Sequence, residues 1–136
     1  MGYSLQFNDL KKFLNSVDKM ADDFNGFLRK LLLQEANKII GLTKDLTPTI
    51  TGDLRRSWIL GDVKGIGTNV QVEILNGMEY ATDVEYGHRL VRNGVELKWV
   101  DGRFMLTISI DKIRKQLPYR YEKDFNLFCR KEGIEP

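Results

Sequence analysis

Residues 46–57 read LTPTITGDLRRS, and this stretch separates a helical part of the chain from a part that predicts strands. Before it, apolar residues recur at steps of three and four from Leu10 to Ile39, which is typical of an amphipathic helix with one buried stripe. After it, apolar residues recur at every second position from Val70 to Ile74, which is typical of a strand with one face on the core. The chain is therefore predicted to be an α+β protein.

The junction itself carries the residues that such a change of structure requires. Pro48 suits the position just past a helix end, and Gly52 permits a sharp reversal because glycine adopts backbone angles that other residues avoid. Leu54 is expected to pack inward. If the strand has already begun, Arg55 and Arg56 point in opposite directions, about 180° apart.

The same reasoning along the rest of the chain gives the order of elements. No linker or repeat interrupts them, so residues 1–136 are predicted to form one domain. A small antiparallel β-sheet is expected to pack against a long N-terminal helix and a C-terminal helix, with a projecting β-hairpin. The first elements are helices at about 8–20 and 22–45, or one kinked rod over both. They are followed by strands at 57–63 and 69–75, joined by a glycine-rich turn at 64–67, and by a helical turn at 80–86 that Gly87 ends. A hairpin at 91–99 around Asn93-Gly94 comes next, and then a helix from Met105 that Pro118 kinks or divides.

Composition argues against several classes of protein. The 21 basic and 19 acidic residues give a net charge of +2, which is too balanced for a strongly basic nucleic-acid-binding protein. The single cysteine, Cys129, cannot form an internal disulfide, so nothing indicates an oxidising compartment. The start of the chain lacks the pattern of a signal peptide, and the apolar runs are too short to span a membrane. A soluble protein made in the cytosol is expected.

The stretch EYATDVEYGHR at residues 79–89 holds the only histidine, His88, close to Asp83 and Glu85. These residue types can serve in acid–base catalysis, but Gly87 is expected to end the helix in a left-handed conformation and to disturb their geometry. The chain has no recognisable nucleophile motif, no zinc-site spacing and no calcium loop. The sequence therefore predicts no enzymatic activity, no cofactor and no metal.

The same stretch is expected to have a structural role. Tyr80 and Val84, four residues apart, are predicted to form a buried ridge, and Ala81 allows close approach. Glu85 and Arg89 are predicted to form an ion pair across the turn. An exposed pair of this kind contributes at most about a few tenths of a kcal/mol.

Three segments resemble a family of small proteins from tailed phages, the tail-component or tail-completion proteins encoded between the head and major tail genes. Residues 48–57 resemble the family's P-x-x-T-G-x-L-R-x-S junction, and residues 80–89 resemble its Y-A-x-x-V-E-[FY]-G-[HT]-R segment. Residues 103–106 resemble its R-P-F-L element. The resemblance covers about residues 8–117, with the three segments in the family's order.

The chain departs from the family pattern at two places. Ile50 stands where many members carry an aspartate, so a hydrogen bond made by that aspartate is not expected here. No proline stands between Arg103 and Phe104, which is expected to loosen the start of the last helix. The hairpin and the extended C-terminus resemble a longer subgroup from prophages and defective phage-like particles of Gram-positive bacteria.

The resemblance implies a structural protein of the virion, present in the host cytoplasm before assembly. It implies a ring, commonly of six copies, at the point where the tail tube meets the head connector, with DNA passing through the lumen without sequence-specific binding. The implied partners are further copies of the chain, the tail-tube protein and the connector protein. A near-neutral charge suits a lumen in which DNA must slide. A tail terminator of the same machine is the nearest alternative.

A closed ring needs surfaces that complement the next copy, and tyrosine, tryptophan and arginine commonly anchor such contacts. Residues of these types gather near the ends of the predicted elements, together with one carboxylate, one phenylalanine and the histidine. The predicted interface residues are Arg55, Arg56, Trp58, Tyr86, Glu85, His88, Arg89, Trp99, Arg103 and Phe104.

An alternative of a different class is a small nucleic-acid-binding module. Its affinity would fall steeply with salt, because phosphate contacts release counterions. The residues that would contact the phosphates are Arg55, Arg56, Arg89, Arg92 and Arg103.

Overall fold

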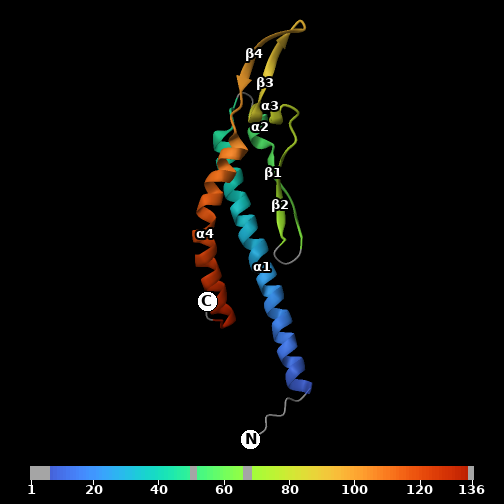
Figure 1. The fold of residues 1–136 in the computed structure, drawn as a ribbon, viewed down its shortest axis with the longest axis vertical. Helices are drawn as coiled ribbons and strands as arrows, with labels where there is room; N and C mark the ends of the chain where they lie inside the picture. The colour runs from blue at the N-terminus through green and yellow to red at the C-terminus, as the bar shows by residue number, and fades with distance from the viewer. Residues whose placement is uncertain (1–6, 50–51, 66–68, 135–136) are drawn as a thin grey trace.

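The computed structural model describes residues 7–49, 52–65 and 69–134, and two long helices form its frame (Figure 1). Helix α1 spans Phe7–Leu46, 40 residues, which corresponds to about 60 Å at 1.5 Å per residue. Helix α4 spans Met105–Glu132 and packs along α1. Two separate two-stranded antiparallel sheets complete the α+β fold predicted from the sequence.

Helix α1 is continuous, so of the two predicted alternatives the single helix is confirmed. The weak helix formers at residues 22–26 do not interrupt it, because aromatic packing holds this part of the helix against α4. The ring of Phe24 lies 6.2 Å from that of Phe125, and the ring of Phe27 lies 5.1 Å from that of Phe128. Tertiary packing of this kind outweighs local helix propensity.

The apolar stripe of α1 is longer than the partner that covers it. Leu31 is buried, but Leu14, Val17 and Met20 are 52%, 45% and 39% exposed. The first part of α1 extends beyond the end of α4 and beyond the sheet (Figure 1). The prediction of one buried stripe is therefore wrong for these turns, while the side chains of residues 7–10 and 13 lie outside the described part of the chain.

Helix α4 runs from Met105 to Glu132 with Pro118 inside it, so of the two predicted alternatives, a new helix or a kink, the new helix is wrong. Contacts with α1 hold the helix on both sides of the proline. Ile113 is buried before it, and after it Arg120 forms an ion pair with the buried Glu35 of α1. Arg120 also donates to the carbonyl of Ile113 at 3.3 Å.

Strands β1 (Trp58–Lys64) and β2 (Gln71–Asn76) form an antiparallel pair against α1, within two residues of the predicted bounds. The register pairs Trp58 with Asn76, and a shift lies between Leu60 and Val63. Along β2 exposed and half-buried residues alternate, as predicted. Residues 66–68 of the predicted turn lie outside the described residues.

The junction before β1 contains a one-turn helix, α2 (Asp53–Arg56), which the sequence did not predict. Gly52 precedes it with φ 80°, and Leu54 is buried, so both predictions for these residues are confirmed. A divergence of about 180° between Arg55 and Arg56 was predicted only if the strand had already begun there, and it has not. They instead follow the helical turn, in which neighbours differ by about 100°. Ile50 and Thr51 lie outside the described part.

The helical turn α3 (Ala81–Tyr86) leads into a hairpin of β3 (Gly87–Arg92) and β4 (Val95–Asp101). The hairpin projects beyond the helices, and it is longer than the predicted 91–99 (Figure 1). Asn93 and Gly94 have φ of 54° and 77°, which is the type I′ turn that Asn-Gly favours. Gly87 has the predicted positive φ, 90°, but its ψ of 168° is extended and not helical.

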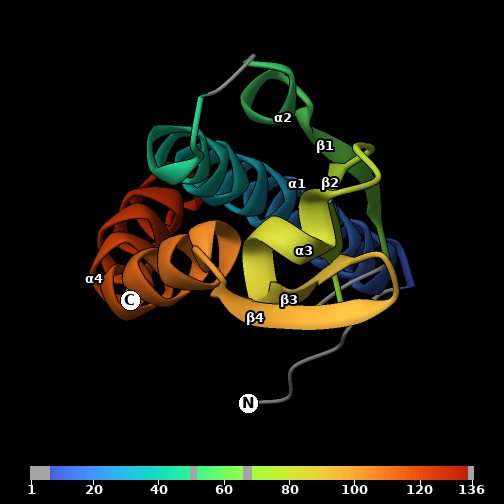
Figure 2. The ribbon, with the colours of Figure 1, turned by 90° about the horizontal axis from the view of Figure 1, so that it is seen from above.

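The core cluster lies where the junction meets α3 and the start of α4. Its buried members are Leu54, Trp58, Ala81 and Met105. Figure 2 shows α3 lying between α2 and the hairpin, so the turn segments enclose this core at one end of the two long helices.

Candidate interaction site

The hairpin is anchored by Glu85, a buried carboxylate of α3 that caps the first turn of α4. One carboxylate oxygen accepts the backbone N–H of Leu106 at 3.0 Å, and the other accepts the N–H of Thr107 at 2.9 Å and its hydroxyl at 2.7 Å. Helix N-termini leave backbone N–H groups without partners and favour negative charge. The helix has no acidic residue in its own first turn and no side-chain cap from Phe104, so Glu85 supplies both.

Two predictions are corrected by this contact. Glu85 does not pair with Arg89, because its oxygens face α4, and Arg89 lies 3.8 Å from Glu96 on β4 instead. The start of α4 is not loosened by the missing proline. It is held by Glu85 and by backbone hydrogen bonds from Arg103 to the carbonyl of Val84 at 2.8 Å and from Phe104 to that of Glu85 at 3.0 Å.

Two glycines allow the chain segments at the hairpin base to cross closely. A Cβ added to Gly102 would lie 2.4 Å from the carbonyl oxygen of Glu85, and one added to Gly87 would lie 2.6 Å from that of Val100. Neither distance is tolerated by a side-chain carbon, so only glycine fits at the two positions. The crossing fixes the hairpin to the end of α3 and the start of α4.

A cavity of about 470 Å³ lies at the base of the hairpin, and we call it the base cavity. Apolar side chains make most of its wall, with two carboxylates, one guanidinium and His88 beside them. The Nδ1 of His88 is enclosed and has no hydrogen-bond partner within the described structure. The lining residues are Pro48, Gly52, Leu54, Tyr80, Asp83, Val84, His88, Val100, Asp101 and Arg103.

The ridge predicted on α3 is shifted by one residue. Ala81 and Glu85 are the buried residues of the turn, while Tyr80 is 41% exposed at the base cavity and Val84 packs only in part against the core. The prediction that Tyr80 is buried is therefore wrong, because the helical turn begins one residue later than the motif suggested.

Two of the predicted interface residues lie inside the fold. Trp58 is buried, and its indole N–H donates to the hydroxyl of Thr47 at 3.0 Å. That hydroxyl in turn donates to the carbonyl of Thr43 at 2.6 Å, so the polar end of the indole is satisfied within the core. Glu85 is the second. Both residues hold the fold together, and neither is exposed to a neighbour.

The other predicted residues are exposed or line the base cavity. Arg55 lies 3.6 Å from Asp45, and Arg56 forms an ion pair with Asp53. The structure gathers the remaining six around the hairpin, with the exposed rings of Tyr86 and Phe104 in edge-to-face contact at 6.4 Å. These six are Tyr86, His88, Arg89, Trp99, Arg103 and Phe104.

Sequence reasoning missed the aliphatic side chains of the hairpin. Every residue from Arg89 to Trp99 is exposed. The alternation of charged and apolar residues in this segment was the available signal, but it does not show that both faces of a hairpin are uncovered. The missed exposed residues are Leu90, Val91, Val95 and Leu97.

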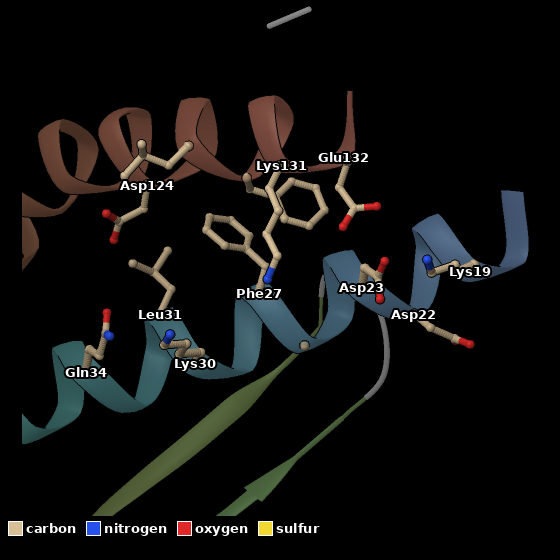
Figure 3. Close-up of a pocket in the computed structure, with 13 residues that line it drawn as sticks. Lys19, Asp22, Asp23, Phe27, Lys30, Leu31, Gln34, Asp124, Lys131 and Glu132 are labelled. Carbon is tan, nitrogen blue, oxygen red and sulfur yellow. The ribbon is translucent and has the colours of Figure 1, made fainter. Parts of the chain in front are cut away.

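A second cavity, of about 850 Å³, lies between the middle of α1 and the C-terminal end of α4 (Figure 3). Phe27 and Leu31 of α1 point toward α4 at its floor, and charged side chains of both signs stand around it, including Asp23 and Lys131. Within residues 7–49, 52–65 and 69–134 no three His, Cys, Asp or Glu side chains are grouped to hold a metal ion. This cavity is the open edge of a helix pair.

One further polar contact was not predicted, the ion pair between Glu35 and Arg120. The guanidinium Nε donates to Glu35 at 2.7 Å, and a second nitrogen bonds the other carboxylate oxygen. Burial alone would raise the pKa of Glu35, but the hydrogen bonds and positive charge of Arg120, with a smaller contribution from Lys38, leave this pKa below its ordinary value. The pair joins the two long helices.

The fold and the site together define an α+β protein with a projecting, uncovered hairpin. Residues 11–87, more than half of the chain, match the profile of the family described as "Bacteriophage HK97-gp10, putative tail-component". The chain belongs to this family and is a structural protein of tailed phages. The match ends at Gly87, so most of the hairpin and all of α4 lie beyond it.

No curated protein and no solved structure matches the chain at a significant level. None of the described helices combines the length and the apolar character needed to cross a membrane.

Proposed function

We propose that this chain is a tail-completion or neck component that joins the tail tube to the head connector as a ring around the DNA channel. It acts through contacts with its neighbours and not through catalysis. Membership of the tail-component family supports a role in the tailed-phage particle, and the uncovered hairpin supports a role in joining.

The observation that carries this proposal is the exposure of the β3–β4 hairpin. A two-stranded hairpin alone is marginally stable in water, and its open edges invite further pairing. Here five large apolar side chains on it are exposed, from 37% at Leu90 to 61% at Val95, with Trp99 at 55%. A surface of this kind fits burial in an assembled particle.

The ion pairs argue against the nucleic-acid-binding alternative. Arg55, Arg56 and Arg89 each lie within 4 Å of a carboxylate of the same chain. A guanidinium whose charge is already balanced gains less from a phosphate than a free one does. We expect no appreciable DNA affinity of the isolated chain, and no steep dependence on salt.

Particle assembly tests the proposal. A phage or prophage that lacks the gene is complemented with the wild-type chain or with a variant carrying Trp99→Ser and Leu97→Ser, and particles are counted by electron microscopy. The proposal expects filled heads and separate tails without the chain and with the variant, and joined particles with the wild type. The matched control Tyr119→Ser changes an aromatic residue that is 79% exposed on α4, and it should join particles normally.

Joined particles in the absence of the chain would overturn the proposed role. Missing or abnormally long tails, in place of finished but detached ones, would favour the tail-terminator role instead.

A further inference from the structure

We propose that the exposed part of the hairpin, residues 89–99, docks in the base cavity of a second copy of the chain. We call this segment the tongue. This contact would join neighbouring copies in the proposed ring, so it rests on the proposed function for the place where it forms. The two surfaces that make it belong to this chain and can be tested without other phage proteins.

The base cavity has the character of a site for a protein side chain. Its volume of about 470 Å³ lies in the range of sites that enclose a sizeable ligand, and its wall is mainly apolar. Binding energy at protein interfaces concentrates where an aromatic or aliphatic anchor fills such a pocket. Trp99 and Leu97 of the tongue, both more than half exposed, are anchors of this type.

The charges of the two surfaces are complementary. The tongue carries three basic side chains, Arg89, Arg92 and Lys98, against the single acid Glu96, which gives it an excess of positive charge. The base cavity carries two carboxylates, Asp83 and Asp101, against the single guanidinium of Arg103, which gives it an excess of negative charge. Complementary potentials favour this pairing and its orientation.

Neither the anchor Trp99 nor the turn of the tongue enters the cavity of its own chain. Trp99 directly precedes Val100, which lines the cavity, and neighbouring residues of a strand point to opposite faces. His88 and Val100 are paired at the base of the hairpin and line the cavity, whereas Arg92 and Val95 are paired at its far end. At about 3.4 Å per residue the tip lies roughly 14 Å further along the strands, and the two-residue turn does not fold back. The occupant is therefore another copy.

A protrusion on one side and a cavity on another make a head-to-tail contact. Such a contact repeats from copy to copy and closes into a ring when the rotation allows it. A reciprocal dimer, in which two copies exchange tongues, uses the same surfaces but cannot add a third copy. The test distinguishes these arrangements.

Disulfide trapping of the full chain provides the test. Cys129 is 2% exposed, so it remains in place and an unsubstituted chain serves as the background control. One variant carries Leu97→Cys on the tongue, a second carries Tyr80→Cys at the cavity, and a third carries both. The matched control is Tyr119→Cys, a more exposed tyrosine on α4.

After oxidation, the mixture of the Leu97→Cys and Tyr80→Cys chains should give a covalent dimer, while each alone and the mixture with Tyr119→Cys should not. The chain with both cysteines should give a ladder of multimers. Adding Trp99→Ser should weaken the affinity between the two copies about thirtyfold, the ratio that corresponds to about 2 kcal/mol. The dimer yield at limiting concentration should fall accordingly.

If the Leu97→Cys chain alone gave as much covalent dimer as its mixture with the Tyr80→Cys chain, the proposal would be overturned in favour of a tongue-to-tongue contact. A doubly substituted chain that stops at the dimer would overturn the head-to-tail arrangement. Absence of the dimer, in concentrated solution and in purified particles alike, would also overturn it. If no dimer forms but heads and tails still need the chain to join, the docking proposal fails and the proposed function stands. If the dimer forms but heads and tails join without the chain, the docking proposal stands and the proposed function fails.

Discussion

The carboxylate of Glu85 accepts the backbone N–H of Thr107 at 2.9 Å, so a residue of α3 caps a helix that begins about twenty residues later. The cap is buried and charge-assisted, and it connects the family's second motif to the start of the last helix.

Removing this cap should destabilise the fold. Glu85→Ala removes the carboxylate that accepts the N–H groups of Leu106 and Thr107, and we expect a loss of about 2–3 kcal/mol in the free energy of unfolding, measured by urea titration. Glu85→Gln should lose less, because one amide oxygen still accepts. Glu79→Ala changes an exposed glutamate nearby and should stay within about 0.5 kcal/mol. Equal stability of the two alanine variants would contradict the capping role.

The glycine crossing should tolerate no side chain. Gly102→Ala places a Cβ 2.4 Å from the carbonyl oxygen of Glu85, and the backbone must shift to relieve it. We expect a loss of about 3 kcal/mol or more, seen as a lower thermal midpoint. Gly77→Ala is the matched control, because an added Cβ meets nothing within 4 Å there. A Gly102→Ala chain as stable as this control would show that the crossing can open.

The uncovered turns of α1 give a contrast within one helix. Leu31→Ala should cost about 2–4 kcal/mol in the free energy of unfolding, because the residue is 6% exposed and points toward α4 (Figure 3). Leu14→Ala should cost less than about 0.5 kcal/mol in the isolated chain, because the residue is 52% exposed. Chemical denaturation of both variants provides the measurement. A comparable cost at Leu14 would mean that another segment or copy covers it in solution.

The pair of Glu35 and Arg120 should make stability depend on pH. A carboxyl whose pKa is lower in the folded chain stabilises the fold above its unfolded pKa, near 4.5, and this stabilisation is lost as pH falls through the folded value. Arg120→Met should therefore cost about 2–3 kcal/mol at neutral pH and less in acid. Urea titrations at several pH values measure both. Lys115→Met, which breaks an exposed pair with Asp111, should cost little at any pH.

Local features of the sequence predicted the fold well where the backbone itself decides the conformation. Gly52 and the Asn93-Gly94 turn adopt the positive φ angles that their residue types allow, and the period of two identified β2. These predictions needed no knowledge of what lies nearby in space.

Predictions failed where a distant segment decides the environment. Trp58 was expected at an interface, but Thr47 and the core enclose it. Glu85 was expected to pair within its own turn, but the start of α4 lies closer to it than Arg89 does. The apolar period of α1 indicates a helix face, yet it cannot show where α4 stops covering that face. The side-chain types were enough to predict that Tyr86, Trp99 and Phe104 are exposed, but they did not predict which residues these rings contact.

The close crossing of Gly87 and Gly102 has a mechanical consequence. Strand β4 leads through Gly102 directly into α4, and the backbone bonds from Arg103 and Phe104 to the end of α3 lock this connection. A pull on the tongue is therefore carried into a helix of 28 residues, about 42 Å long, and through the Glu35–Arg120 pair into α1. The hairpin is thus connected to both long helices through buried or backbone contacts, and not only through the chain itself.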